Sequence, residues 1–435
     1  MMYVSTRGKS PSVSIGDAIR NGAAPDGGLY LPETPPVIDV DALRDIPTLA
    51  EFAPLFLEPF FEGDPLQLEL PAICREAFDF PVPITVPDPQ DQQLHALELF
   101  HGPTGAFKDF GARFLMACFD RLGDPAKPLT VLVATSGDTG GAVGCAAEGR
   151  RAVRAGILFP KGRVSPFQEL QLTCWHDPVK AFEVLGDFDD CQRMVKAAFA
   201  DRALSDALRL TSANSINIGR LLPQAAYIAF AAMRVFQGSG LAPGFLIPTG
   251  NLGHGFAAIY ARTLGIPIGP VVASTNANRT LYEWHRSGTY APGPSVATIA
   301  NAMDVGAPSN FERLVELPEA DREIAVELVD DDTIRARIRS EHQRCGYVWD
   351  PHSATAVEAY ARMDAEKRGG RAWLVAATAH PYKFADIVEP AIGTAVPPPP
   401  ALEAILGCKA RKDTIPPEDA ALAEALHAAF AAQPA

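Results

Sequence analysis

The sequence lacks the residue patterns on which several common classes of protein depend. Its seven cysteines lie far apart, at positions 74, 118, 145, 174, 191, 345 and 408, and include no C-x-x-C pair. This spacing argues against disulfide bonds and zinc sites and favours a reducing compartment. The nine histidines form no H-E-x-x-H or other paired ligand spacing, so we expect no bound metal.

Positive charge and long apolar runs are also scarce. The 38 lysines and arginines are outnumbered by 52 acidic residues, and the net charge of −14 leaves no basic face for nucleic acid. The most apolar helical stretch, residues 225–233, is about half as long as a membrane span. The N-terminus lacks the apolar core of a signal peptide. We therefore expect a cytoplasmic protein with neither a nucleic-acid nor a membrane partner.

The pattern along the chain changes near residue 93. Residues 1–92 are rich in proline and predict a small, mostly helical N-terminal domain. From residue 93 to 395, short apolar runs alternate with helical patterns, which is typical of an α/β fold with a parallel sheet. The predicted strands are residues 129–135, 153–159, 180–185, 245–249, 271–275 and 373–378. Residues 396–435 predict a proline-rich spacer and a helical tail.

Lys108 stands where an apolar strand passes through a glycine-containing loop into an amphipathic helix. Backbone N–H groups at the start of a helix disfavour the ammonium form of such a lysine. A neutral lysine is a nucleophile, and its commonest use is a Schiff base with a carbonyl compound or with pyridoxal phosphate (PLP). The alternative is an ordinary surface lysine in a first helical turn. The rest of the chain decides between the two.

Two glycine-rich loops each lead from a predicted strand into a helix. They contain Ser136, Gly137, Asp138 and Thr139 in the first, and Gly250, Asn251, Leu252, Gly253 and His254 in the second. Free N–H groups at a helix N-terminus, with glycines that allow close approach, favour anion binding over a plain turn. Neither loop has the glycine spacing of a Rossmann motif. The loop before Lys108 lacks the glycine that directly precedes the lysine in a Walker A motif, so NAD and ATP are disfavoured.

Two further polar groups follow the same pattern. Asn214, Ser215 and Asn217 precede a long apolar helix, where they either cap the helix or donate to an anion. Thr378 closes the last predicted strand, at the end where open α/β sheets bind ligands. One lysine able to form a Schiff base, together with two anion-binding loops, predicts a PLP enzyme. One loop would take the cofactor phosphate and the other the substrate carboxylate.

Several segments together resemble the threonine synthase family, a member of the tryptophan-synthase-β group of PLP enzymes (fold type II). They are S-T-R-G at 5–8, A-P-D-G-G-L-Y at 24–30, L-F-H-G-P-T at 99–104, A-F-K-D-F-G at 106–111, S-G-D-T-G at 136–140, N-S-I-N at 214–217, N-A-M-D-V-G at 301–306, P-S-N-F at 308–311 and A-T-A-H-P at 377–381. Single motifs occur in several PLP lyases, but this combination is specific to the family. The resemblance implies a parallel-sheet fold with two α/β subdomains and an additional, mostly helical N-terminal domain.

The resemblance also implies roles for individual residues. Lys108 would bind PLP covalently and act as general base, and Thr378 would hydrogen-bond the pyridine nitrogen. The cofactor phosphate would be held by Gly250, Asn251, Leu252, Gly253 and His254, the substrate carboxylate by Ser136, Gly137, Asp138 and Thr139, and the departing phosphate by Asn214, Ser215 and Asn217. Arg113 and Arg220 are weaker candidates for the phosphate, because each is equally compatible with a solvated helix position.

The implied reaction converts O-phospho-L-homoserine and water into L-threonine and phosphate, catalysed by a monomer or a homodimer. Two alternatives stay open: a PLP phospholyase or amino-acid dehydratase that adds no water at Cβ, and a binding protein without catalysis. The sequence departs from the family at two places. The phosphate loop usually reads G-N-F-G-D, whereas this chain has Leu252 and His254, and Gly105 stands where the family often has leucine. An imidazole at position 254 would help to bind phosphate through its charge.

Overall fold

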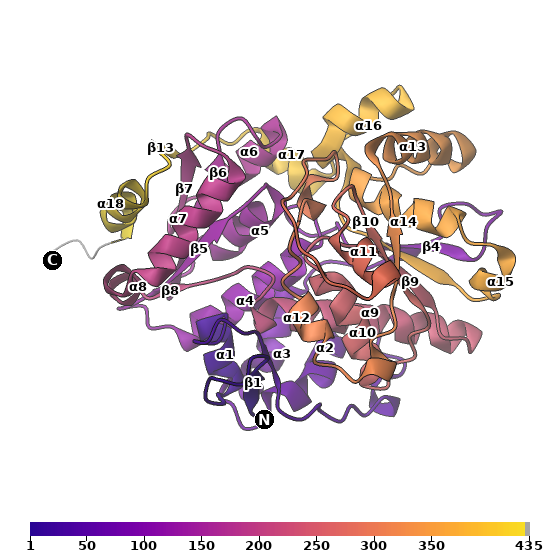
Figure 1. Cartoon of the computed structure of the whole chain (residues 1–435), viewed down its shortest axis with the longest axis horizontal. Helices are drawn as coiled ribbons and strands as arrows, with labels where there is room; N and C mark the ends of the chain where they lie inside the picture. The colour runs from indigo at the N-terminus through magenta and orange to yellow at the C-terminus, as the bar shows by residue number, and fades with distance from the viewer. Residues whose placement is uncertain (431–435) are drawn as a thin grey trace.

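The computed structural model describes residues 1–430 of the 435. Its two larger sheets lie in separate α/β lobes, with helices α4 (Lys108–Leu122) and α9 (Ile218–Ser239) between them (Figure 1). The six-stranded sheet has the order β11-β10-β9-β12-β4-β3, and the five-stranded sheet has the order β13-β7-β6-β5-β8. The two α/β subdomains expected from the resemblance are confirmed.

Six of the strands in these two sheets match the apolar runs predicted at 129–135, 153–159, 180–185, 245–249, 271–275 and 373–378. The six-stranded sheet consists of β3 (Ile84–Thr85), β4 (Leu94–Glu98), β9 (Gly244–Pro248), β10 (Val271–Thr275), β11 (Ala325–Leu328) and β12 (Trp373–Ala377). The five-stranded sheet consists of β5 (Leu129–Ala134), β6 (Val153–Pro160), β7 (Val179–Val184), β8 (Leu210–Thr211) and β13 (Asp413–Ile415). The pairing is parallel except between β3 and β4. The prediction of a mainly parallel sheet is confirmed.

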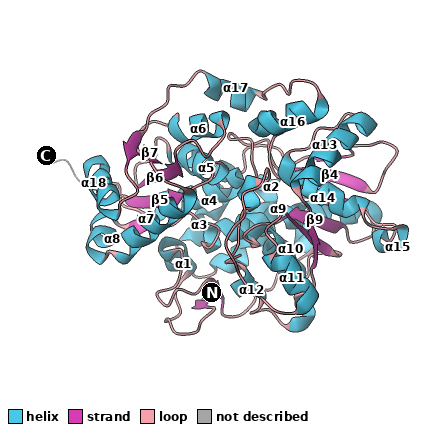
Figure 2. Cartoon of the chain, turned by 45° about the horizontal axis from the view of Figure 1, so that its top comes forward, coloured by secondary structure: helices cyan, strands magenta, loops and turns pink. Residues whose placement is uncertain are grey.

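Helices flank the sheets of both lobes (Figure 2). In the lobe of the five-stranded sheet they are α5 (Asp138–Ala147), α6 (Pro166–Thr173), α7 (Phe188–Ala200) and α8 (Arg202–Leu208). In the lobe of the six-stranded sheet they are α10 (Gly253–Thr263), α11 (Thr280–Ser287), η3 (Asn301–Met303), α12 (Phe311–Leu314), η4 (Glu319–Asp321), α13 (Asp331–Cys345), α14 (Pro351–Ala361), α15 (Ala365–Arg368), η5 (Pro381–Phe384) and α16 (Ala385–Ile392). Among the helices of residues 1–430, none is both long and apolar enough to cross a lipid bilayer.

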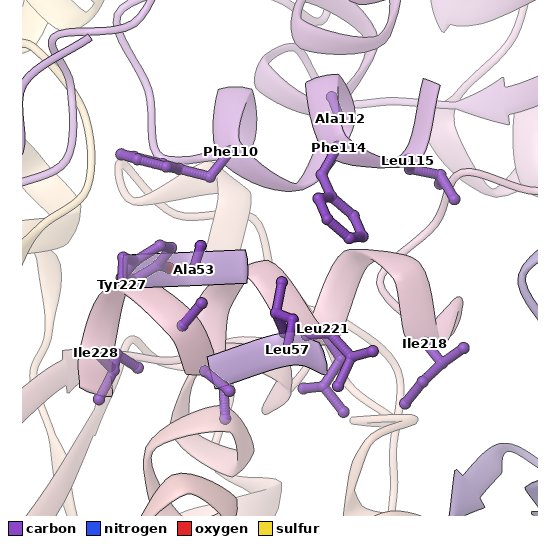
Figure 3. Packing of buried hydrophobic residues seen from close by; sticks show 14 of the residues in the cluster. Ala53, Leu57, Phe110, Ala112, Phe114, Leu115, Ile218, Leu221, Tyr227 and Ile228 are labelled. Carbon is purple, nitrogen blue, oxygen red and sulfur yellow. The ribbon is translucent and has the colours of Figure 1, made fainter. Parts of the chain in front are cut away.

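The N-terminal region is mostly helical, as predicted. It contains β1 (Tyr3–Ser5), α1 (Ile15–Asn21), β2 (Tyr30–Pro32), η1 (Asp41–Leu43), α2 (Leu49–Leu57), η2 (Glu58–Phe61) and α3 (Leu66–Ala77). Figure 3 shows how it joins the main core: Leu57 of α2 lies beside Phe114 of α4 and Leu221 of α9. All three side chains are fully buried. This apolar contact fixes the position of α4 and α9, whose residues form the site described below.

The predicted tail does more than follow the α/β region. Helix α17 (Pro400–Leu406) lies against α6, and α18 (Asp419–Phe430) lies against α7 and α8 (Figure 2). Between them β13 adds a parallel strand to the edge of β7, with Asp413 opposite Phe182. The sequence predicted helix here but not this strand. Residues 431–435 of the predicted tail lie outside the described residues.

Candidate active site

A cavity lies between the two lobes, at the carboxyl ends of the parallel strands. The last residue of β9 and those that follow it line the cavity at 248–254, Thr378 lines it directly after β12, and Asp138 lines it beyond β5. The first residues of α4 and one face of α9 complete the wall. Ligands in open α/β sheets bind outside these strand ends. The cavity therefore lies where the fold leaves backbone and side-chain donors free.

Hydrogen bonds hold the lysine loop against the end of β12. The Phe107 N–H donates to the Thr378 carbonyl at 2.8 Å, and the His380 N–H donates to the Gly105 carbonyl at 2.9 Å. Inside the loop, the buried Asp109 carboxylate accepts from the Thr104 N–H at 2.9 Å and from its hydroxyl at 2.6 Å. These contacts place Lys108 next to Thr378, as the assigned roles of both residues require.

Lys108 is the first residue of α4, and its side chain is partly exposed to the cavity. Its Nζ lies 4.3 Å from the centroid of the Phe107 ring. Burial and the nearby Arg220 guanidinium lower the pKa of Lys108 from 10.5 to about 8, and Asp138 only partly opposes them. A neutral amine is therefore accessible near physiological pH. The surface-lysine alternative does not fit this environment.

The second glycine loop approaches the neighbouring backbone very closely. A Cβ atom at Gly250 would lie 2.7 Å from the Met303 Cα, so only glycine fits there. Leu252 takes a left-handed conformation, with φ of 60°, directly before α10. The loop residues 250–254 all line the cavity. The N-terminus of α10 thus faces the cavity with free N–H groups, a suitable place for a phosphate.

Asn251 lines the cavity and also holds this loop in place. Its Nδ2 donates to the Ser215 hydroxyl at 2.5 Å, and its carbonyl accepts from the Asn310 side chain at 3.1 Å. The buried Arg313 in turn donates to Asn310 Oδ1 at 2.6 Å and to the Tyr30 carbonyl at 3.2 Å. The N-terminal region is thereby connected to the phosphate loop through three hydrogen bonds.

His254 does not carry the charge that the sequence suggested. Its side chain is 5% exposed, and its ring stacks on Phe107 with centroids 4.8 Å apart. Burial and the neighbouring Lys108 lower the pKa of His254 from 6.5 to about 3. The imidazole is therefore neutral near physiological pH. This favours a neutral hydrogen bond to phosphate over the charge assistance expected from the sequence.

The first glycine loop reaches the cavity through Asp138 alone. Ser136, Gly137 and Thr139 are not among the residues that line it. The Asp138 carboxylate lies 3.1 Å from the ammonium of Lys383, which also donates to the Thr104 carbonyl at 2.7 Å. Burial raises the pKa of Asp138, but Lys383 and its other partners outweigh it, so the carboxyl is charged. The role of residues 136–139 in holding a substrate carboxylate stays a prediction.

Of the five residues considered for the departing phosphate, two line the cavity and three do not. Ser215 and Arg220 line the cavity. Asn217 caps α9: its Nδ2 donates to the Ile19 and Ser212 carbonyls, both at 2.9 Å, and its Oδ1 accepts from the Gly219 N–H. Asn214 is half-buried and does not line the cavity, and Arg113 donates to the Ala77 carbonyl at 3.1 Å away from it.

Arg220 is buried rather than solvated. It is 3% exposed, one of its terminal nitrogens donates to the Ala213 carbonyl at 2.7 Å, and its Nε has no hydrogen-bond partner among residues 1–430. Burial lowers the pKa of Arg220 from its ordinary value to about 10, so it is still a cation. An unpaired donor on a buried cation at a cavity wall is well suited to an anion.

Sequence reasoning missed four residues around this cavity. His352 lines it and lies 2.8 Å from Asp350, whose carboxylate also accepts from the Ser353 hydroxyl. The Ser353 hydroxyl accepts from the Thr378 N–H at 3.0 Å. Lys383 forms an ion pair with the charged Asp138, as described above. The D-P-H-S run at 350–353, a cap followed by proline, was the available signal for the first three.

The residues present fit the expected cofactor. PLP needs an amine that becomes neutral easily, donors for a phosphate and a partner for its ring nitrogen. Lys108, the N–H groups at the start of α10 and the Thr378 hydroxyl supply these. Two buried nitrogens, Arg220 Nε and His254 Nδ1, have no partner among the described residues and mark positions for ligand oxygens.

Comparison with known protein families gives consistent matches along most of the chain. The model described as pyridoxal-phosphate-dependent enzyme matches residues 90–378. The models described as threonine synthase N terminus and threonine synthase, C-terminal match residues 2–78 and 353–426. The C-terminal match continues through α17 and β13 into α18, so the tail is part of the family's architecture.

Individual relatives agree with the family models. The threonine synthase of Haemophilus influenzae is 37% identical over 396 residues, covering 90% of this chain and 91% of that protein. The crystal structure of threonine synthase from Escherichia coli matches with a TM-score of 0.90 and 34% identity, covering 98% of this chain and 100% of the other. PLP-bound threonine synthase from Brucella melitensis gives the same TM-score and identity, with coverage of 99% and 100%. The chain belongs to the threonine synthase family of PLP-dependent enzymes.

Proposed function

We propose that this enzyme converts O-phospho-L-homoserine and water into L-threonine and phosphate. The observation that carries the proposal is the pair formed by Lys108 and Arg220 at one cavity. A lysine with a lowered pKa provides the group that moves protons, and a buried arginine with a free donor provides a place for the phosphate that leaves. Together with membership of the family, this pair favours a phosphorylated amino-acid substrate.

Lys108 and the loop 250–254 would hold PLP. Bound there, the cofactor supplies an electron sink that stabilises negative charge on the substrate carbon. The N–H groups at the start of α10 would bind the cofactor phosphate, and Gly250 would allow the backbone to approach it. Lys108 lies within reach of both lobes because the lysine loop is bonded to the end of β12.

The Lys108 amine is the group placed to move protons at the substrate Cα and then at Cβ. Its pKa of about 8 gives it a substantial neutral fraction near neutral pH, as a general base requires. The ring of Phe107 and the surrounding apolar core keep the amine poorly hydrated. Both effects come from the position of Lys108 at the start of a buried helix.

Arg220 and Ser215 would hold the substrate phosphate on the α9 side of the cavity. Arg220 offers an unpaired Nε–H, and Ser215 is fixed by Asn251. An arginine pairs well with a phosphate because its charged donors make strong hydrogen bonds in a buried site. We retain Ser136, Gly137 and Thr139, with Asp138 neutralised by Lys383, as the site for the substrate carboxylate.

Thr378 would donate its hydroxyl hydrogen to the ring nitrogen. Within residues 1–430, the one hydrogen-bond contact of the Thr378 hydroxyl is with the Ser353 hydroxyl at 3.5 Å, a long contact. Ser353 gives its own hydrogen to Asp350 and already accepts from the Thr378 N–H at 3.0 Å. The Thr378 hydroxyl is therefore free to donate to a nitrogen without protonating it. Asp350 and Ser353 act as positioning residues.

Product analysis tests the proposed reaction. The holoenzyme is incubated with O-phospho-L-homoserine, and threonine, phosphate and 2-oxobutyrate are measured together. We expect threonine and phosphate in equal amounts, with no turnover by Lys108→Ala. Phosphate released with 2-oxobutyrate and without threonine would instead identify a phospholyase. Absence of turnover, with PLP retained, would identify a binding protein.

We further propose a cytoplasmic enzyme, active as a monomer or homodimer, with divisions at residues 1–92, 93–395 and 396–435. All seven cysteines, which lie within the described residues, are free thiols, as a reducing compartment favours. Sedimentation of the holoenzyme would give the oligomeric state. Cell fractionation and limited proteolysis would test the location and the divisions.

A further inference from the structure

Tyr227 and His254 form a buried polar pair on the α9 side of the cavity. The Tyr227 hydroxyl lies 2.9 Å from His254 Nε2, and the two rings meet edge to face with centroids 5.5 Å apart. Tyr227 is fully buried and His254 is 5% exposed. His254 lines the cavity, whereas Tyr227 stands behind it. Tyr227 was assigned no role by the sequence.

The hydrogen-bonding capacity of the pair determines which ring nitrogen carries the proton. A tyrosine hydroxyl has one hydrogen to donate. His254 Nε2 is its recorded partner within residues 1–430, and the nearby Arg220 offers donors only. If Nε2 carried the hydrogen, the Tyr227 hydrogen would be buried without an acceptor, which costs about 1–3 kcal/mol. The lower-energy arrangement has Tyr227 donating to a bare Nε2.

The hydrogen of the neutral imidazole then sits on Nδ1. This atom is buried and has no partner among the described residues. Phe107 covers the ring face, and the pKa of about 3 keeps the ring neutral. A buried Nδ1–H beside a cavity needs an acceptor. Ligand oxygens are the acceptors that the surrounding donors, Arg220 and the start of α10, also require.

We propose that Tyr227 is a positioning residue that holds His254 as the Nδ1–H tautomer, so that His254 donates a neutral hydrogen bond to a phosphate monoester in the cavity. This inference deepens the proposed function and rests on it. Cofactor and substrate both carry a phosphate monoester, so the same donor suits either. The aspartate usual at this position in the relatives has no hydrogen to donate when it is ionised. In the present chain, the pair of Tyr227 and His254 provides a hydrogen-bond donor, the His254 Nδ1–H.

A double-mutant cycle tests the proposal, because asparagine at position 254 offers an amide donor close to the place of Nδ1 and has no tautomer to be set. Tyr227→Phe is made in the wild-type and in the His254→Asn background. For each full-length holoenzyme, the dissociation constant of PLP reports the cofactor phosphate. The inhibition constant of inorganic phosphate against O-phospho-L-homoserine reports the substrate phosphate.

We expect Tyr227→Phe to weaken one of these constants about five- to tenfold with His254 present, and less than about twofold in the His254→Asn background. The amide of His254→Gln lies nearer to the position of Nε2. His254→Gln should therefore weaken the binding of the phosphate group concerned, whereas His254→Asn should retain it. ¹⁵N NMR of the holoenzyme should show His254 protonated at Nδ1. A loss that is equal in both backgrounds would make Tyr227 merely structural and overturn the proposal, as would a proton on Nε2.

The binding measurements also separate this inference from the proposed reaction. If the variants show the expected coupling but no threonine is formed, the reaction assignment fails and the role of Tyr227 stands. If threonine is formed and the coupling is absent from both constants, the reaction stands and the inference fails. A change in the PLP constant alone identifies the cofactor phosphate as the acceptor. A change in the phosphate constant alone identifies the substrate.

Discussion

At the scale of single residues, the site is built from basic side chains whose charged forms are destabilised by burial. Lys108 and Arg220 are two cations facing the same cavity, and burial together with the charge of Arg220 destabilises the ammonium form of Lys108. His254 next to them is held neutral. Because an anionic ligand would relieve this excess of positive charge, we expect the same residues to serve both phosphate binding and proton transfer.

The lowered pKa of Lys108 predicts how PLP attaches to the PLP-free enzyme. Attachment needs the neutral amine, and a lowered pKa makes this form appear at lower pH. The rate should therefore rise with pH up to about 8 and then level off, instead of climbing towards 10.5. Arg220→Met, which removes a nearby positive charge, should move the profile to higher pH. A rate that rises as steeply above pH 8 as below it would contradict this pKa.

Arg220 and Arg113 form a matched pair of arginines for testing the phosphate site. Arg220→Lys should weaken inhibition by inorganic phosphate about tenfold, since lysine does not reproduce the Nε donor. Arg113→Lys should leave that constant unchanged, because Arg113 bonds the Ala77 carbonyl outside the cavity. Equal effects of the two substitutions would show that general positive charge, and not the Arg220 donor, attracts phosphate.

Much of the site's chemistry could be predicted from the sequence, but several contacts could not. Lys108 and the loop 250–254 stand at strand ends, which apolar runs and glycines mark clearly. Arg220 was underrated because its surroundings depend on the packing of α4 against α9. The spacing of Arg220, Gln224 and Tyr227 along one helix face was the signal. Arg220 and Gln224 line the cavity, and Tyr227 lies behind it, bonded to His254. Lys383 comes from a distant segment, and its pairing with Asp138 follows only from the tertiary fold.

At the scale of elements, the lysine loop is covered by a helix from the tail. Gly105 has φ of 66°, and a Cβ atom there would lie 3.0 Å from Leu402 Cδ1 in α17. The family's larger residue at this position would meet both backbone strain and this side chain. Leu402 is fully buried and fills the space over the loop. The departure at Gly105 therefore has a structural partner in the tail.

Gly105→Ala should destabilise the protein through strain, about 1–3 kcal/mol, together with the contact to Leu402. Gly149→Ala is the control, because Gly149 has a similar φ of 72° and nothing within 4 Å of the added Cβ. The difference between the two, measured by urea unfolding, isolates the contact with α17. Equal losses in the free energy of unfolding would show that α17 accommodates the extra Cβ atom without destabilising the protein.

Helices and strands differed in how well the sequence predicted them. β5 and β6 are long, nearly continuous apolar runs, and a capping box formed by Ser165 and Gln168, with proline between them at 166, marks the start of α6 in the sequence. β13 escaped prediction because its three residues, Asp413–Ile415, are short and partly polar. Its strand conformation comes from pairing with β7, a long-range contact that no local pattern records.

At the scale of the whole molecule, the tail stabilises one lobe from outside. Leu426 is fully buried against a core that includes Leu158 and Phe182. Leu426→Ala should cost about 2–5 kcal/mol in the free energy of unfolding. Leu406→Ala, at a position that is 44% exposed, should change it by less than about 0.5 kcal/mol. The dissociation constant of PLP should be unchanged in both, and a parallel loss of PLP affinity would show that α18 also shapes the cavity.

The strand β13 also has a consequence for synthesis of the chain. β7 is complete long before Asp413–Ile415 leave the ribosome, yet its outer edge is paired by that last strand. Until then, the N–H and C=O groups of β7 face water or any other strand that meets them. A nascent chain stalled before residue 413 would hold an open sheet edge and so be prone to aggregate, whereas release of the finished chain closes that edge within the same molecule.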